Sequence, residues 1–179
     1  SMPEMMIGFF PDVGGTYFLA QLPAEIFRFA CLTAYRFTAA DLMHYRLAEI
    51  GVPIAAVGDP AVFATVLQGL KGRDEIVRAM TGAFPRTSDL GASRLAAFES
   101  RIQARFGGKT LAELYPLCRE MLTEKEFEPL GFFLQQFLEG SPVSARATEE
   151  ICRTTQGLSH LQVLERDFAV AMRFCEEPD

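Results

Sequence analysis

The chain has 179 residues, 49% of them hydrophobic, so it can bury the core of an ordinary folded domain. Its 17 basic and 23 acidic side chains give a net charge of −6, and no run of Lys or Arg is longer than a pair, which argues against nucleic acid as a partner. No apolar run approaches the ~20 residues of a membrane span, so no membrane partner is expected.

Four cysteines are spread along the chain: Cys31, Cys118, Cys152 and Cys175. None belongs to a C-x-x-C pair, and only two histidines could complete a metal site, so no metal is predicted. We interpret the cysteines as buried, reduced thiols, which indicates a reducing compartment.

Residues 1–12 are predicted to form the end of a strand and a loop. The pattern becomes helical from Gly14, and Pro23 introduces a second helix over 24–33. Thr38 and Asp41 have the spacing of a capping box and predict a short helix over 39–47. After Gly51, the β-branched run "VPIAAV" predicts a short strand.

Helical periodicity then continues to the end of the chain. Helices are expected near 60–70, 73–81, 92–106, 109–122, 125–139, 141–155 and 158–175. Further capping residues are Ser88 or Asp89, and Thr110 and Thr123, each of the latter two with a Glu three residues on. The sequence therefore predicts a mixed α and β region over 1–58 and a helical region over 59–179.

Two carboxylates, Glu4 and Asp12, lie in the almost wholly apolar stretch "MPEMMIGFFPDVGG", residues 2–15. A carboxylate in such surroundings is costly to keep ionised, so each needs a partner or a role. Asp12 either caps the helix that begins near Gly14 or serves a site there. Glu4 either points to solvent from a strand edge or lies in an apolar cleft, where its pKa would rise toward a value useful for general acid or base work.

The stretch "MPEMMIGFFPDVGGTYFLAQLP" resembles the signature of the enoyl-CoA hydratase/isomerase (crotonase) superfamily: a Pro-Glu, a Gly four residues later, a Pro, and then Gly-Gly-Thr before a Leu-rich helix. "ACLTAYRFTAADLMHYRLAEIGVP" is similar to the stretch that follows in that superfamily. "FFPDVGG", with Asp12 where hydratases usually have Gly, and "EGSPVSARAT" at 139–148 resemble the 3-hydroxyisobutyryl-CoA hydrolase branch.

The resemblance implies part of an α/β crotonase-type spiral, predominantly helical with few short strands, that hydrolyses an acyl-CoA thioester. It implies that Glu4 attacks the acyl carbon or activates water, and that Asp12 binds the substrate hydroxyl or orients the water. Coenzyme A is part of the substrate, and no separate cofactor is expected. It also implies valine degradation as the pathway, and a mitochondrial matrix location in a eukaryote or a cytoplasmic one otherwise.

The family's oxyanion donors, and most of its CoA-binding surface, precede the segment that this chain matches. We therefore expect that this chain alone is inactive and that the amino-terminal half of the fold is its partner, with a homo-oligomer as a further possibility. Three positions depart from the family pattern: Met5 for Thr, Ala34 for Gly, and "RLAE" at 46–49 for Gly-Leu-Ala-Thr. A hydratase or isomerase, and an inactive structural or assembly subunit, remain the alternatives.

Other residue types that often carry chemistry have simpler interpretations here. His44 and His160 lie in predicted helices and are interpreted as non-catalytic. Ser141 and Ser144 lack a G-x-S-x-G elbow, so helix capping is preferred. The Phe-rich run "GFFLQQFLEG" has helical spacing and predicts core packing.

Overall fold

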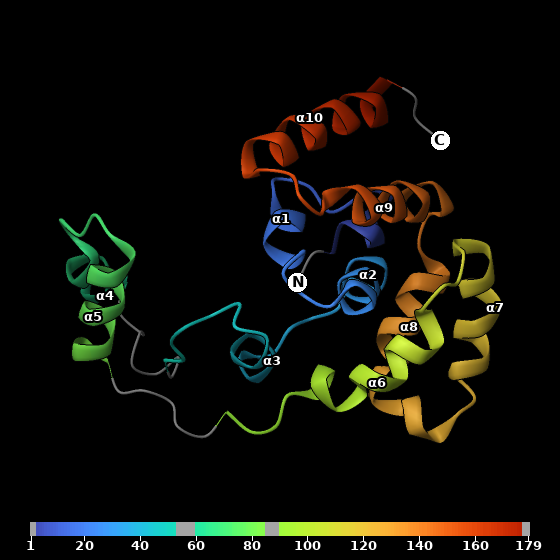
Figure 1. The fold of residues 1–179 in the computed structure, drawn as a ribbon, viewed down its shortest axis with the longest axis horizontal. Coiled ribbons are helices and arrows are strands. Elements are labelled where there is room, and N and C mark those ends of the chain that lie inside the picture. Colours follow the sequence, from blue (N-terminus) through green and yellow to red (C-terminus); the bar gives the residue numbers. More distant parts are fainter. Residues whose placement is uncertain (1–2, 53–59, 85–89, 177–179) are drawn as a thin grey trace. The chain divides into compact units, whose positions relative to one another are not determined.

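The computed structural model of this chain describes residues 3–52, 60–84 and 90–176 (Figure 1). Contacts divide the chain into two compact units, one of residues 1–36 and 98–179 and one of residues 37–97. The predicted boundary at 58/59 falls in 53–59, outside the described residues, and it stays a prediction. No helix in the described part is long and apolar enough to cross a membrane.

The first unit is built from helices of both chain ends. Its elements are η1 (Pro3–Ile7), α1 (Gly15–Leu19), α2 (Ala24–Leu32), most of α6 (Arg94–Phe106), α7 (Leu111–Met121), η3 (Lys125–Leu130), α8 (Gly131–Glu139), α9 (Pro142–Thr155) and α10 (His160–Glu176). Helix α9 packs against α2, α1 and α7, and α8 packs against α7 and η1 (Figure 1). The core thus joins the first 32 residues to the last 80 or so.

Large apolar side chains fill this core because the helices carry them at helical spacing. Fully or almost fully buried members are Ile26, Phe29, Leu32, Ile102, Phe106, Leu114, Met121, Leu134, Phe137 and Ile151. The predicted packing role of the Phe-rich run is confirmed for Phe133 and Phe137, whereas Phe132 is exposed and carries the Arg36 guanidinium 5.5 Å from its ring centroid. Arg28 ties three helices together by an ion pair to Glu149 and a hydrogen bond to the Phe106 carbonyl.

The second unit contains α3 (Ala39–His44), α4 (Pro60–Leu67), α5 (Arg73–Ala83) and the first turn of α6. Helices α4 and α5 pack on each other, with the Phe63 and Phe84 rings 6.1 Å apart. None of the residues within α4 or α5 is buried. The buried residues of this unit include Asp41 of α3 and Leu95 of α6, and Asp41 is held by the Ser93 hydroxyl and the Leu95 N–H.

Most predicted helix starts are confirmed. Thr38 with Asp41, and Thr110 with Glu113, form complete capping boxes. The Ser141 hydroxyl accepts a hydrogen bond from the Ser144 N–H at the start of α9, so the capping interpretation of that serine is confirmed. Ser88 and Asp89 lie outside the described residues.

Three local predictions are wrong. The end of a strand predicted within residues 1–12 is the 3-10 helix η1, because an apolar run this short carries no periodicity that separates strand from helix. The helix predicted over 125–139 is split into η3 and α8, since Pro129 has no N–H to donate within a continuous helix. Thr123 does not cap that segment, and its hydroxyl donates instead to the Glu120 carbonyl.

No strand occurs in residues 3–52, 60–84 and 90–176. The few short strands of the expected fold therefore stay a prediction, and most of "VPIAAV" lies in 53–59, outside the described residues. Three cysteines, Cys31, Cys118 and Cys152, are free and buried as predicted, whereas Cys175 is free but exposed on α10.

Candidate active site

Glu4 lies in η1, which packs against α8. The helix is followed by a tight reversal, since the Phe9 N–H donates to the Glu4 carbonyl at 2.9 Å and Gly8 has a left-handed φ of 75°. One carboxylate oxygen of Glu4, Oε2, is buried and has no hydrogen-bond partner among the described residues. Glu4 is therefore a partly buried acid whose charge is incompletely satisfied.

Met5 holds η1 in place where the hydrolase pattern has Thr. Its side chain is 1% exposed, and its sulfur accepts a hydrogen bond from the Thr148 hydroxyl of α9 at 3.2 Å. A Cβ on Gly140, between α8 and α9, would stand 3.3 Å from the Met5 carbonyl oxygen. Met5 thus fills a core position between η1 and α9.

The electrostatics of Glu4 suit acid–base work. Burial raises the pKa of Glu4 above its ordinary value of 4.5, a hydrogen bond from its own backbone N–H lowers it, and the charge of Asp12 raises it again. The charge of Glu4 in turn helps to raise the pKa of Cys31 on α2, after burial and a hydrogen bond with Cys152. The structure therefore brings Glu4 near both Asp12 and α2.

Asp12 lies in the loop between η1 and α1, residues 8–14. Its carbonyl accepts a hydrogen bond from the Gly15 N–H at 3.0 Å, and the N-cap residue of α1 is Gly14, with no side-chain cap. The alternative that the Asp12 side chain caps this helix is therefore wrong. Val13 and Gly14 both have left-handed φ angles, 49° and 78°. This angle is unfavourable for Val13 because its side chain is β-branched. The Val13 side chain is also 75% exposed, so little packing offsets the cost.

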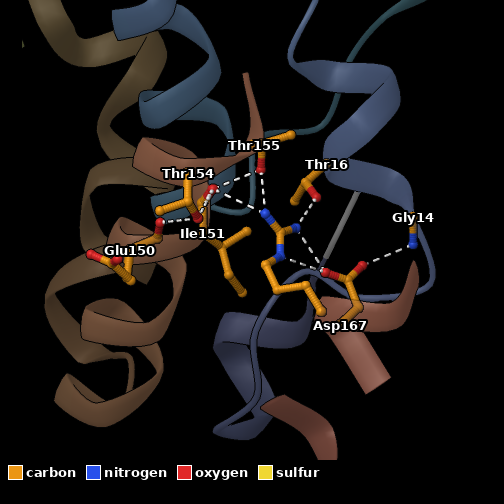
Figure 2. Close-up of polar contacts among 8 residues, drawn as sticks. Gly14, Thr16, Glu150, Ile151, Thr154, Thr155 and Asp167 are labelled. Atoms are coloured by element: carbon orange, nitrogen blue, oxygen red, sulfur yellow. Dashed lines mark hydrogen bonds and ion pairs between the residues drawn. The ribbon is translucent and has the colours of Figure 1, made fainter. Parts of the chain in front are cut away.

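A different carboxylate holds this loop. The Gly14 N–H donates to Asp167 Oδ2 of α10 at 3.0 Å, in a buried contact between residues 153 positions apart. Asp167 Oδ1 accepts from the Arg166 guanidinium at 2.8 Å, and that guanidinium also donates to Thr16 and Thr155 at 3.0 and 2.8 Å. Figure 2 shows Thr16, Thr155 and Asp167 converging on one guanidinium.

His160 meets the same loop from the first turn of α10. Its ring stacks on Tyr17, with centroids 5.0 Å apart. A Cβ on Gly14 would stand 2.7 Å from His160 Nε2, so a larger residue at this position would collide with the ring as well as meeting an unfavourable φ. His44, by contrast, is exposed at the end of α3.

The sequence pattern points to the two carboxylates but not to Arg166, Asp167 or the approach of His160 to the loop. The signal that could have found Asp167 is its position on α10, since it lies four residues after Val163 on the buried side of an amphipathic helix. No comparable signal shows that its partner is Gly14.

Two pockets of the first unit lie beside α9. One of 270 Å³ is lined by residues of α2 and α9 that include Arg28 and Glu149, and one of 290 Å³ is lined by residues that include Tyr17 and Thr155. Neither Glu4 nor Asp12 lines these two pockets, so a dry cleft between the carboxylates stays a prediction. Within the described ranges, no group of three or more His, Cys, Asp or Glu side chains could hold a metal ion.

Similarity to known proteins identifies the family of this chain. The family model for enoyl-CoA hydratase/isomerase matches residues 1–179. The chain belongs to this family. The predicted crotonase resemblance is thereby confirmed, while the catalytic roles of Glu4 and Asp12 stay a prediction.

Its relatives within the enoyl-CoA hydratase/isomerase family include hydrolases. The chain is 44% identical over 196 residues to the mitochondrial 3-hydroxyisobutyryl-CoA hydrolase of Homo sapiens, covering 97% of this chain and 47% of the relative. It is 25% identical over 158 residues to 3-hydroxyisobutyryl-CoA hydrolase 1 of Arabidopsis thaliana, covering 82% and 38%. The chain thus spans less than half the length of these curated relatives.

A solved relative supports the fold. The structure of a carnitinyl-CoA dehydratase from Mycobacterium thermoresistibile superposes with a TM-score of 0.76 and 26% identity, over 100% of this chain and 49% of that one. This chain therefore has a crotonase-type fold, while the few short strands predicted for it stay a prediction.

Proposed function

We propose that the protein is an acyl-CoA thioester hydrolase and that its substrate is 3-hydroxyisobutyryl-CoA. The observation that carries the proposal is Glu4, whose pKa is raised by burial and by Asp12 and whose Oε2 atom has no partner among the described residues. Similarity to the human 3-hydroxyisobutyryl-CoA hydrolase supports the choice of reaction and substrate.

The chemistry needs a base or nucleophile at the acyl carbon and donors for the oxyanion that forms there. Glu4 either attacks the acyl carbon or takes a proton from the attacking water, and Asp12 binds the substrate hydroxyl or orients that water. In the net reaction, water adds its oxygen to the acyl carbon, the carbon–sulfur bond breaks, and the thiol of coenzyme A leaves with a proton.

Several properties of the whole protein are proposed with this function. The oxyanion donors and most of the CoA surface come from the amino-terminal half of the fold, which acts together with the segment described here. We propose that the protein needs no separate cofactor, binds neither nucleic acid nor membrane, and can form a homo-oligomer. The human and rat relatives are named mitochondrial, which supports a mitochondrial matrix location and a role in valine degradation in a eukaryote.

A hydratase or dehydratase is the second candidate, because the solved relative is named a carnitinyl-CoA dehydratase. The two reactions differ in product: hydrolysis releases a thiol, and hydration or dehydration does not. Asp12 favours hydrolysis, since the family pattern of hydratases has Gly at this place.

The test measures thiol release and double-bond absorbance with the full-length protein, using 3-hydroxyisobutyryl-CoA, isobutyryl-CoA and crotonyl-CoA. We expect thiol release from 3-hydroxyisobutyryl-CoA and a fall of about 100-fold in the Asp12→Gly variant. A change in absorbance without thiol release would establish the hydratase instead. No reaction with any of the three esters would favour a structural or assembly subunit.

A further inference from the structure

We propose that Asp167 of α10 is a positioning residue for the reaction, because it fixes the Asp12 loop, residues 8–14, against Glu4. This inference rests on the proposed hydrolase function and deepens it. Helix α10 would thus affect the site through the backbone of Gly14, without contact with the substrate.

The loop needs an external restraint because its conformation is unfavourable by itself. Two consecutive residues, Val13 and Gly14, take left-handed φ angles directly after Asp12. A β-branched residue such as Val13 rarely adopts this conformation, and an exposed Val13 side chain gains little packing to offset it. Surrounding contacts must therefore hold the loop.

Asp167 supplies this restraint through the backbone of Gly14. Its Oδ2 accepts from the Gly14 N–H at 3.0 Å, two residues from Asp12. Asp167 is only 3% exposed, so this charge-assisted bond is shielded from competing water. Replacing Asp167 with Asn would leave one carbonyl oxygen for two donors, the Gly14 N–H and the Arg166 guanidinium, so one donor would lose its partner and the loop would be free to rearrange.

Arg166 keeps Asp167 in place. It donates to Asp167 Oδ1 and to the hydroxyls of Thr16 and Thr155, both of which are buried (Figure 2). One guanidinium thereby joins α10 to α1 and α9 and neutralises the Asp167 charge. The carboxylate consequently has both oxygens engaged and one orientation.

Asp167 would affect the reaction indirectly, through the charge of Asp12. That charge contributes to raising the pKa of Glu4, whereas Asp167 is not among the groups that shift it. If Asp167 holds Asp12 near Glu4, then loss of Asp167 must lower the pKa of Glu4 indirectly. A residue that only stabilised the fold would not have this effect.

The experiment compares Asp167→Asn and Asp12→Asn in the full-length protein, with their double variant. Hydrogen exchange of the peptide that contains Gly14 is measured together with the pH dependence of kcat/KM for thiol release from 3-hydroxyisobutyryl-CoA. The matched control is Glu165→Gln, which removes one carboxylate from an exposed position of the same helix. We expect no change in either measurement for this control.

For Asp167→Asn we expect faster exchange at Gly14, a fall in kcat/KM of about tenfold or more, and an acid limb displaced to lower pH. Asp12→Asn should displace the limb in the same direction, and the double variant no further than Asp12→Asn alone. A folded Asp167→Asn protein with an unchanged acid limb would overturn the proposal, whether or not exchange at Gly14 is faster.

Failure of Asp167→Asn to fold and failure of the hydrolase function have separate tests. If Asp167→Asn does not fold, Thr155→Val decides, because it removes one of the hydroxyls that orient the Arg166 guanidinium and so loosens the Asp167 carboxylate that Arg166 holds. A displacement of the acid limb in the same direction is expected, and none would overturn the proposal. If the unaltered protein releases no thiol, the hydrolase function fails, and unchanged exchange at Gly14 in Asp167→Asn would then reject the restraint separately.

Discussion

At the scale of single residues, the site depends on a carboxylate that the fold leaves incompletely satisfied. Glu4 has a buried oxygen with no partner among the described residues, next to a core position filled by Met5. Burying a polar atom without a hydrogen bond costs free energy. Such a cost is typical of functional sites, where an ionisable group is kept ready for a reaction at the expense of stability.

The Glu4→Gln variant should therefore be more stable than the unaltered protein at pH 7. Because the folded-state pKa of Glu4 lies above 4.5, the folded state holds its proton more tightly than the unfolded state, and stability is lost as pH rises through the raised value. The gain of Glu4→Gln should grow from pH 4 to pH 7, as measured by urea unfolding followed by circular dichroism.

The control for this prediction is Glu128→Gln, at an exposed position of η3, which should change the free energy of unfolding by less than about 0.5 kcal/mol. A Glu4→Gln variant that is less stable at pH 7, or whose gain increases toward acid pH, would show that the carboxylate is satisfied after all.

At the scale of elements, helix ends and contacts across the chain decide the structure together. Sequence was sufficient for α2, α9 and α10, and for both complete capping boxes, because apolar spacing and local side-chain hydrogen bonds lie within a few residues. It was insufficient for η1, whose conformation depends on contacts of Met5 with residues 135 or more positions away. The bond between Gly14 and Asp167 leaves no local pattern for the same reason.

The capping box of α3 also shows how one element is fixed by another. Asp41 accepts from the Thr38 N–H, the Ser93 hydroxyl and the Leu95 N–H, and it is fully buried. Burial alone would raise the pKa of Asp41, but these hydrogen bonds outweigh it and hold the pKa below its ordinary value of 3.8. The first residues of α6 are thereby attached to the start of α3.

Asp41→Asn should lower the free energy of unfolding at pH 7 by about 2 kcal/mol, because the amide NH₂ would face hydrogen-bond donors. A depressed folded-state pKa stabilises above pH 3.8, and this contribution is lost as pH falls through the folded-state value. The difference between variant and unaltered protein should thus shrink at acid pH in urea titrations.

Asp74→Asn is the matched control, since Asp74 is an exposed acid of the same unit and forms a surface ion pair with Arg73. Its expected change is within about 0.5 kcal/mol. Equal effects of the two substitutions would contradict the proposed role of Asp41 as a buried link between α3 and α6.

At the scale of the whole molecule, the described chain is a family member that spans less than half of its curated relatives. In the proposed enzyme, this chain would contribute Glu4 and Asp12, and the oxyanion donors would come from the remaining part of the fold. The restraint on the Asp12 loop became visible only when both ends of the first unit were placed together.

The central claim is that Glu4 is the group that acts on the thioester. Its most direct test is the rate of thiol release from 3-hydroxyisobutyryl-CoA by the full-length protein and by its Glu4→Gln variant, at pH 7 and with folding verified by circular dichroism. The account predicts steady release by the unaltered protein and a loss of about 100-fold or more in the variant. Equal rates from the two proteins would contradict it.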